Sequence, residues 1–80
     1  MPVRVLFLGQ LADLAGTGEI SVPAPLDWDG LLRSVPAAVA ERLPAETVKL
    51  ACAGQVLADK ISLCAMDGDE VALLPPVSGG

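Results

Sequence analysis

Near its start the chain carries an apolar run, residues 3–9, in which only Arg4 interrupts the apolar side chains on the two pleat faces. The run is rich in valine and leucine and ends at Gly9, so we predict a central strand. Residues 19–22 alternate polar with apolar positions, which is typical of a half-buried strand. A glycine-rich turn precedes this second strand. The pattern therefore predicts a hairpin, with residues 10–15 forming a long loop or a helical turn.

The next pattern has the period of a helix. Asp27 is a good N-cap residue, because its carboxylate can accept a hydrogen bond from the first turn. Pro36 lies within the pattern and predicts a kink or a restart, and Pro44 predicts that the helix has ended by Leu43. The apolar positions recur at spacings of three and four, which predicts one buried helix face: Trp28, Leu31, Leu32, Val35 and Val39.

Three further strands are predicted in the second half of the chain. Residues 48–53 are mostly apolar, Gly54-Gln55 is predicted to form a turn, and residues 56–58 form a short partner strand. Asp67-Gly68-Asp69 is a strong turn signal, and residues 70–74 follow it as the last strand. The spacing of these segments fits a small mixed sheet.

The order strand, strand, helix, strand, short strand, strand predicts an α+β fold of the ubiquitin-like β-grasp type, with a mixed sheet packed on a main helix. Eighty residues allow one small domain. We assign residues 1–74 to the β-grasp domain and residues 75–80 to a flexible C-terminal tail that ends in Gly79-Gly80. The two prolines at the start of this tail cannot donate to a sheet ladder and favour an extended backbone.

The strands carry more apolar surface than one helix can cover. If Val5 and Phe7 face the helix, the pleat turns the intervening leucines to the opposite face. An exposed apolar patch on a small domain usually marks a partner surface. Leu8, Leu57 and Leu74 are predicted to form such a patch beside the root of the tail, unless the 10–15 segment and the neighbouring strands cover them.

Composition narrows the possible partners. The net charge of −5 disfavours nucleic acid and anionic membranes as partners and fits a basic protein surface better. Cys52 and Cys64 are isolated, without a CxxC pair, a histidine or an evident secretory leader. We therefore predict buried free thiols in a reducing cytoplasm. No apolar run is long enough to cross a bilayer.

Residues for side-chain catalysis are nearly absent. The chain has no histidine and no tyrosine, so the usual triads and metal sites cannot be assembled. Asp67, Asp69 and Glu70 form a short carboxylate cluster without the spaced ligands of a calcium loop, and we predict a solvated turn and no metal site. Lys49 and Lys60 are predicted to be surface charges.

The remaining candidate for a reacting group is the C-terminal carboxylate of Gly80. Val77, Ser78 and Gly79 precede it, and residues without a Cβ let such a terminus enter a narrow channel. A carboxylate is a poor electrophile, but conversion to an acyl adenylate removes its charge and installs a good leaving group. Attack by sulfide then gives a thiocarboxylate, which delivers tethered sulfur into a partner's pocket. This chemistry requires a partner that uses ATP.

Two blocks of the sequence, one at each end of the chain, resemble a known protein family. Residues 3–16, VRVLFLGQLADLAG, and residues 67–80, DGDEVALLPPVSGG, resemble the small subunits of molybdopterin synthases. The resemblance implies a sulfur carrier that is not an enzyme on its own and binds no cofactor. Gly80 would be adenylated by an E1-like enzyme that uses ATP and sulfurated with a sulfur donor enzyme. Its thiocarboxylate would enter the large synthase subunit, in a tetramer of two small and two large subunits, and supply the dithiolene sulfur of molybdopterin to the cyclic pyranopterin precursor.

Two positions depart from the pattern of this family. Many relatives have a basic residue where Ala12 stands and a valine-asparagine pair near Ala53-Gly54. Three other functions remain compatible with the sequence: a sulfur carrier of another pathway such as thiamine synthesis, a ubiquitin-like modifier conjugated to lysines, and an interaction module with an inert tail.

Overall fold

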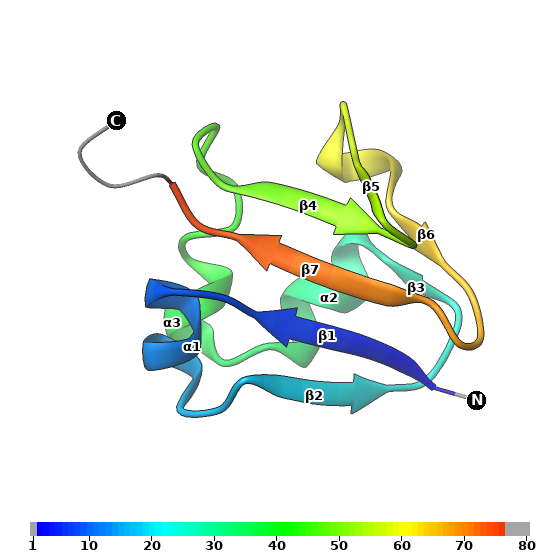
Figure 1. Cartoon of the computed structure of the whole chain (residues 1–80), viewed down its shortest axis with the longest axis horizontal. Helices are drawn as coiled ribbons and strands as arrows, with labels where there is room; N and C mark the ends of the chain where they lie inside the picture. The colour runs from blue at the N-terminus through cyan, green and yellow to red at the C-terminus, as the bar shows by residue number, and fades with distance from the viewer. Residues whose placement is uncertain (1, 77–80) are drawn as a thin grey trace.

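The computed structural model describes residues 2–76 of the chain. Its main sheet has five strands in the spatial order β2-β1-β7-β4-β5 (Figure 1). β1 and β7 are parallel and the other neighbours are antiparallel, so the sheet is mixed as predicted. The strands of this sheet are β1 (Val3–Phe7), β2 (Glu19–Val22), β4 (Lys49–Cys52), β5 (Gln55–Val56) and β7 (Glu70–Leu74).

The helices lie on one side of the main sheet (Figure 1). None of the helices in residues 2–76 is long and apolar enough to cross a membrane. A second, two-stranded sheet pairs two very short strands that the sequence pattern did not predict. These elements are α1 (Gln10–Ala15), α2 (Trp28–Ser34), α3 (Ala37–Ala40), the 3-10 helix η1 (Lys60–Ser62), β3 (Leu26–Asp27) and β6 (Cys64–Ala65).

The two ends of α2 follow the sequence signals. Asp27 has extended backbone, and its Oδ1 accepts a hydrogen bond from the Gly30 backbone N–H at 2.8 Å, as expected of an N-cap. A Cβ on Gly30 would lie 3.1 Å from that oxygen, so a glycine leaves room for the cap. Val35 is extended because the ring of Pro36 disfavours helical backbone in the residue before it. The predicted restart at Pro36 is therefore confirmed.

The core lies between the helices and the main sheet. Leu31 enters it from α2, Val35 from the position directly after α2, and Val39 from α3. Burying a leucine or valine side chain contributes about 1.5–3 kcal/mol, so this layer supplies most of the driving force for folding. The sheet contributes alternate residues of its central strands, all with at most 2% of their surface exposed: Val3, Val5, Phe7, Leu50, Val71 and Leu73.

The segment 10–15, predicted as a loop or a helical turn, is the helix α1. It ends at Gly16, which has a positive φ of 75° and donates its N–H to the Ala12 carbonyl. This is the usual αL termination of a helix. A helix of 6 residues is not stable in isolation. Tertiary packing stabilises α1, because its Leu11 is buried in the core.

The hairpin between β4 and β5 turns one residue earlier than predicted. Cys52 pairs with Gln55, so the two turn residues are Ala53 and Gly54, and Gln55 already belongs to β5. Both turn residues have positive φ, 52° and 85°. This is the backbone of a type I′ turn, which matches the twist of the flanking strands. The prediction of a Gly54-Gln55 turn was wrong because the glycine occupies the second turn position, not the first.

Ala53 is strained in this turn, and its replacement tests the assignment. Left-handed backbone costs an ordinary residue about 1–2 kcal/mol, and asparagine tolerates it best. We expect Ala53→Asn to raise the free energy of unfolding by roughly 0.5–1 kcal/mol, measured by urea denaturation. Gly54→Ala is the matched control: a Cβ there meets no atom within 4 Å, so a loss of stability would come from the backbone alone. If Ala53→Asn destabilised the protein, the turn assignment would fail.

Candidate functional site

The root of the predicted tail is held by the centre of the main sheet. β7 lies between β1 and β4 and ends at Leu74, directly before Pro75 and Pro76 (Figure 1). The ring of Pro75 packs against the backbone at Gly9, where a Cβ would lie 3.1 Å from the proline Cγ. The tail therefore starts at a fixed place beside the end of β1. The predicted acyl site and threading residues lie outside the described residues: Val77, Ser78, Gly79 and Gly80.

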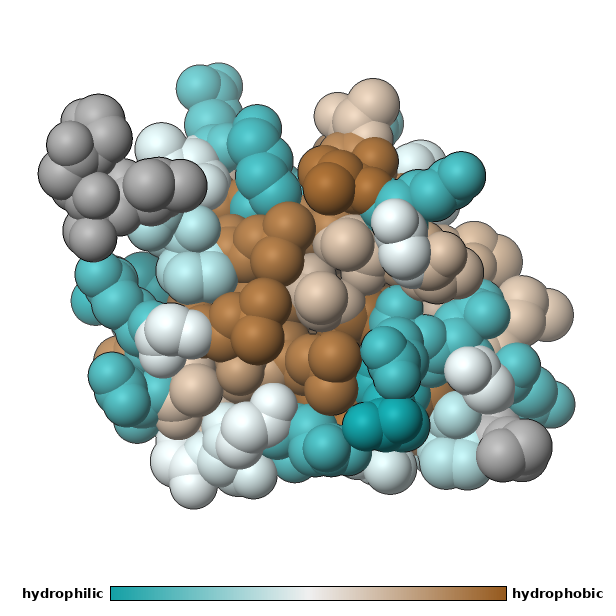
Figure 2. All heavy atoms as spheres, viewed as in Figure 1, coloured by the Kyte–Doolittle hydropathy of each residue, from teal (hydrophilic) through white to brown (hydrophobic). Residues whose placement is uncertain are grey.

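The face of the main sheet opposite the helices has no covering element among residues 2–76 (Figure 1). Apolar residues gather in the middle of this face (Figure 2). The register explains this, because Leu6, Ala72, Ala51 and Val56 are successive partners on neighbouring strands and share a face. Leu8 is 41% exposed and Val56 62% exposed. We call this group the open-face patch: Leu6, Leu8, Ala51, Val56, Ala72 and Leu74.

Of the three leucines predicted to meet beside the tail, the structure brings two together. Leu8 is exposed just after β1, and Leu74 is half-buried at the end of β7. The placement of Leu57 with them is wrong. Its N–H donates to the carbonyl of Leu50 at 2.8 Å, so it continues the β4–β5 pairing on the helix side of the sheet, where it packs against the core. Val56 occupies the open face instead.

The sequence contained a signal that would have identified Val56. Ala53-Gly54 is a two-residue turn, and it fixes the pairing of Ala51 with Val56. Because cross-strand partners point to the same face, this pairing puts Val56 on the open face and the next residue on the helix side. A one-residue error in the turn therefore moved the predicted interface residue to the wrong side of the sheet.

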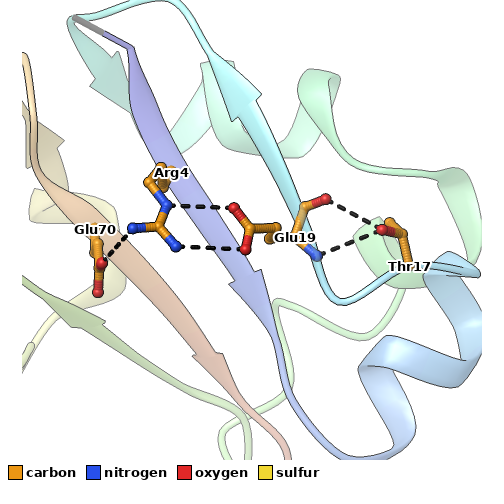
Figure 3. A network of polar contacts seen from close by, with 4 residues as sticks. All are labelled: Arg4, Thr17, Glu19 and Glu70. Atoms are coloured by element: carbon orange, nitrogen blue, oxygen red, sulfur yellow. Dashed lines mark hydrogen bonds and ion pairs between the residues drawn. The ribbon is translucent and has the colours of Figure 1, made fainter.

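A charged network of Arg4, Glu19 and Glu70 borders the open-face patch, because Arg4 lies two residues before Leu6 on the same face of β1. Figure 3 shows its side chains. The Arg4 guanidinium donates to both carboxylate oxygens of Glu19 at 3.2 and 3.3 Å and to Glu70 at 2.9 Å. Hydrogen bonding to Glu19 is the main cause of the raised pKa of Arg4, and the charges of both carboxylates add to it. All three side chains are about half exposed, so the network contributes little to stability. It does give the patch a polar border.

The acidic turn before β7 has structural roles. An Asp69 carboxylate oxygen accepts a hydrogen bond from the Met66 backbone N–H at 2.9 Å, which closes the turn. Glu70 is paired with Arg4. Among residues 2–76 no group of three carboxylate, cysteine or histidine side chains is arranged to hold a metal ion.

The two cysteines are free thiols with different exposure. Cys52 is half-buried at the end of β4 and packs against the core, and burial is the main cause of its raised pKa. Cys64 is exposed, so the prediction of a buried thiol was wrong for this residue. In the short strand β6 alternate side chains point to opposite sides, and Ala65 takes the buried position.

Lys60 is not the surface charge that the sequence suggested. Its ammonium donates three hydrogen bonds to backbone carbonyls, of Leu43 at 2.6 Å, Ala45 at 2.6 Å and Val48 at 2.9 Å. It also lies 5.9 Å from the centre of the Trp28 ring. Burial, followed by the charge of Lys49, lowers the pKa of Lys60. The lysine thus ties the segment after α3 to η1.

A surface hollow of about 630 Å³ adjoins this lysine. Leu57, Ile61 and the Trp28 ring supply its apolar wall. Lys49 and Glu46, which carry opposite charges, also line it. The hollow therefore lies at the β5 edge of the sheet, away from the charged network of Arg4.

The mixed sheet, the main helix on one face and the central C-terminal strand define a ubiquitin-like β-grasp protein of the α+β class. The crystal structure of SAMP1 from Haloferax volcanii superposes with a TM-score of 0.76 at 23% identity and covers 100% of both chains. At this identity the likeness concerns the fold.

The sequence profile of the ThiS family matches residues 5–80, and the chain belongs to this family. It is 38% identical to the molybdopterin synthase sulfur carrier subunit of Escherichia coli K12 over 80 residues, which cover 98% of this chain and 99% of that protein. It also resembles a chain in the complex of subunits 1 and 2 of the molybdopterin-converting factor from Helicobacter pylori, with a TM-score of 0.68, 28% identity and full coverage of both chains.

Proposed function

We propose that this chain is the sulfur-carrier subunit of a molybdopterin synthase and that Gly80 carries the sulfur. The observation that supports this most strongly is the 38% identity to the Escherichia coli sulfur carrier subunit over almost the full length of both chains. On this proposal the chain is not an enzyme by itself. It holds no cofactor and acts in the cytoplasm as the donor subunit of the synthase.

The chemistry takes place at the terminal carboxylate. An oxygen of the Gly80 carboxylate attacks the α-phosphorus of ATP on an E1-like partner, and pyrophosphate leaves. Hydrosulfide released by a donor enzyme then attacks the acyl carbon, a C–S bond forms, the C–O bond to AMP breaks, AMP leaves with the bonding electron pair, and loss of the thiol proton to water leaves a thiocarboxylate. This group donates its sulfur to the cyclic pyranopterin precursor inside the large subunit, where tethering makes the transfer a proximity-driven step.

The open-face patch supplies the docking surface in this proposal. It contains Leu8 and Leu74 at the root of the tail, so a large subunit that covers it would receive the tail in the same step. A patch of this kind on a small protein usually marks a partner site. The Helicobacter pylori complex is named as one of subunits 1 and 2, which fits a pair of one carrier and one large subunit. We propose a tetramer of two carriers and two large subunits.

Intact mass spectrometry of the protein isolated from cells tests the proposal. Replacing a terminal oxygen by sulfur adds about 16 Da, and fragmentation should map the change to the last peptide. Protein from cells that lack the activating enzyme should not show this species. A persulfide on Cys52 or Cys64 would add about 32 Da instead, so it is distinguishable. If no terminal thiocarboxylate formed in cells that make molybdopterin, the proposal would be refuted.

A further inference from the structure

The two lysines of this chain have very different surroundings. Lys60 is half-buried and donates hydrogen bonds to three backbone carbonyls, whereas Lys49 is exposed on β4. An ε-amine attacks an acyl group only when its nitrogen lone pair is free to point at the acyl carbon. The surroundings therefore decide which lysine of this chain can be acylated.

The nitrogen of Lys60 is enclosed by acceptors. An ammonium has three N–H donors, and here each one meets a carbonyl oxygen at 2.6–2.9 Å. Loss of a proton would leave a lone pair facing one of these oxygens. A lowered pKa by itself would favour Lys60 as a nucleophile, but attack on an acyl donor would require the side chain to leave all three carbonyls. Geometry thus opposes its acylation.

Lys49 meets no such constraint. No hydrogen bond or ion pair with another residue in the 2–76 range engages its ammonium, and the residue is exposed. It pairs with Leu74, the last residue of β7, so it stands beside the strand that leads into the tail. The amine is therefore accessible beside the end of β7.

We propose that Lys49 is the acyl-acceptor site of this chain, taking acyl groups from activated carboxyl donors. Two donors share this chemistry: a small acyl phosphate, and the Gly80 adenylate of a second copy of this chain. The second donor rests on the proposed function, and the first does not.

The reaction is a simple acyl transfer. The neutral ε-amine of Lys49 attacks the acyl carbon, a C–N bond forms, and the C–O bond to phosphate or AMP breaks. The leaving group takes the bonding electron pair, and the amine's extra proton goes to water. The product is an amide, which removes the positive charge of Lys49 next to Leu74.

The first experimental arm uses the full-length chain and acetyl phosphate at limiting extent, with peptide mapping by mass spectrometry. We expect Lys49 to be acetylated at least about tenfold faster than Lys60, because Lys60 must first give up three hydrogen bonds. Lys49→Arg keeps the charge and should remove most of the ε-acetylation. Equal or faster acetylation of Lys60 in the wild-type chain would overturn the proposal.

The second arm adds the E1-like enzyme and ATP, without a sulfur source, and follows pyrophosphate release. We expect a covalent dimer whose mass is two chains less about 18 Da, joined by an amide between Gly80 and Lys49, and absent in Lys49→Arg. Pyrophosphate release with a dimer joined at another lysine, or with none, would exclude the Gly80 adenylate as a donor to Lys49. Without pyrophosphate release the proposed function itself fails, and the acetyl phosphate arm alone decides the proposal.

Discussion

Deletion of Gly80 is expected to abolish sulfur transfer completely while leaving the folded domain unchanged. The deletion leaves a carboxylate on Gly79, one residue short of the position at which the activating enzyme would form the adenylate. A displacement of one residue, about 3.3–3.6 Å of extended chain, is far greater than an in-line attack tolerates. The loss should therefore be one of activity and not of affinity for the partner.

The experiment compares the deletion with Ser78→Ala, which keeps the length of the tail. Thiocarboxylate formation is measured by intact mass, and cofactor synthesis by complementation of a carrier-deficient strain. Thermal unfolding should be the same for both variants and the wild type within about 1 °C, because the core is built from residues 3–73. If the truncated chain still supported cofactor synthesis, Gly80 would not be the sulfur site.

Binding provides a second readout for this deletion. The open-face patch is unchanged in the truncated chain, so we expect it to form a complex with the large subunit and to compete with the intact carrier. Loss of complex formation would mean that the tail, and not the patch, supplies the binding energy. The comparison thus separates docking by the domain from the chemistry of its terminus.

Most of the fold was predictable because local and long-range signals agree. The proline within the helical pattern, the Asp27 cap and the paired runs of β-branched residues each specify one structure. The short strands β3 and β6 were missed because two residues leave no period to detect. The helix α1 has no side-chain cap and is short, so only its packing through Leu11 decides its conformation.

The candidate site was predictable only in part. Alternation along β1 and β7 was enough to assign Leu6 and Leu74 to the face opposite the core. The position of Val56 depended on a turn whose first residue, Ala53, is an unusual choice for positive φ. The role of Lys60 has no local signature, because its three acceptors lie 12 to 17 residues earlier in the chain.

The largest loss of stability from a single polar side chain is expected for Lys60→Met. The carbonyls of Leu43 and Val48 are part-buried, and methionine fills the space of the lysine stem without offering a donor. Hydrogen bonds from a charged donor contribute about 1.5–3 kcal/mol each when buried, and partial exposure reduces this. We expect a loss of roughly 3 kcal/mol in the free energy of unfolding, measured by urea denaturation.

Lys49→Met is the matched control, since it removes an exposed ammonium from the same part of the molecule. We expect this variant to change stability by less than about 0.5 kcal/mol. Lys60→Arg should fall between the two, because a planar guanidinium cannot direct three N–H groups from one nitrogen at three carbonyls. If Lys60→Met were no more destabilising than Lys49→Met, the three hydrogen bonds would not stabilise the fold. The Lys60 ammonium would then also leave the three carbonyls at little cost and would not be shielded from an acyl donor.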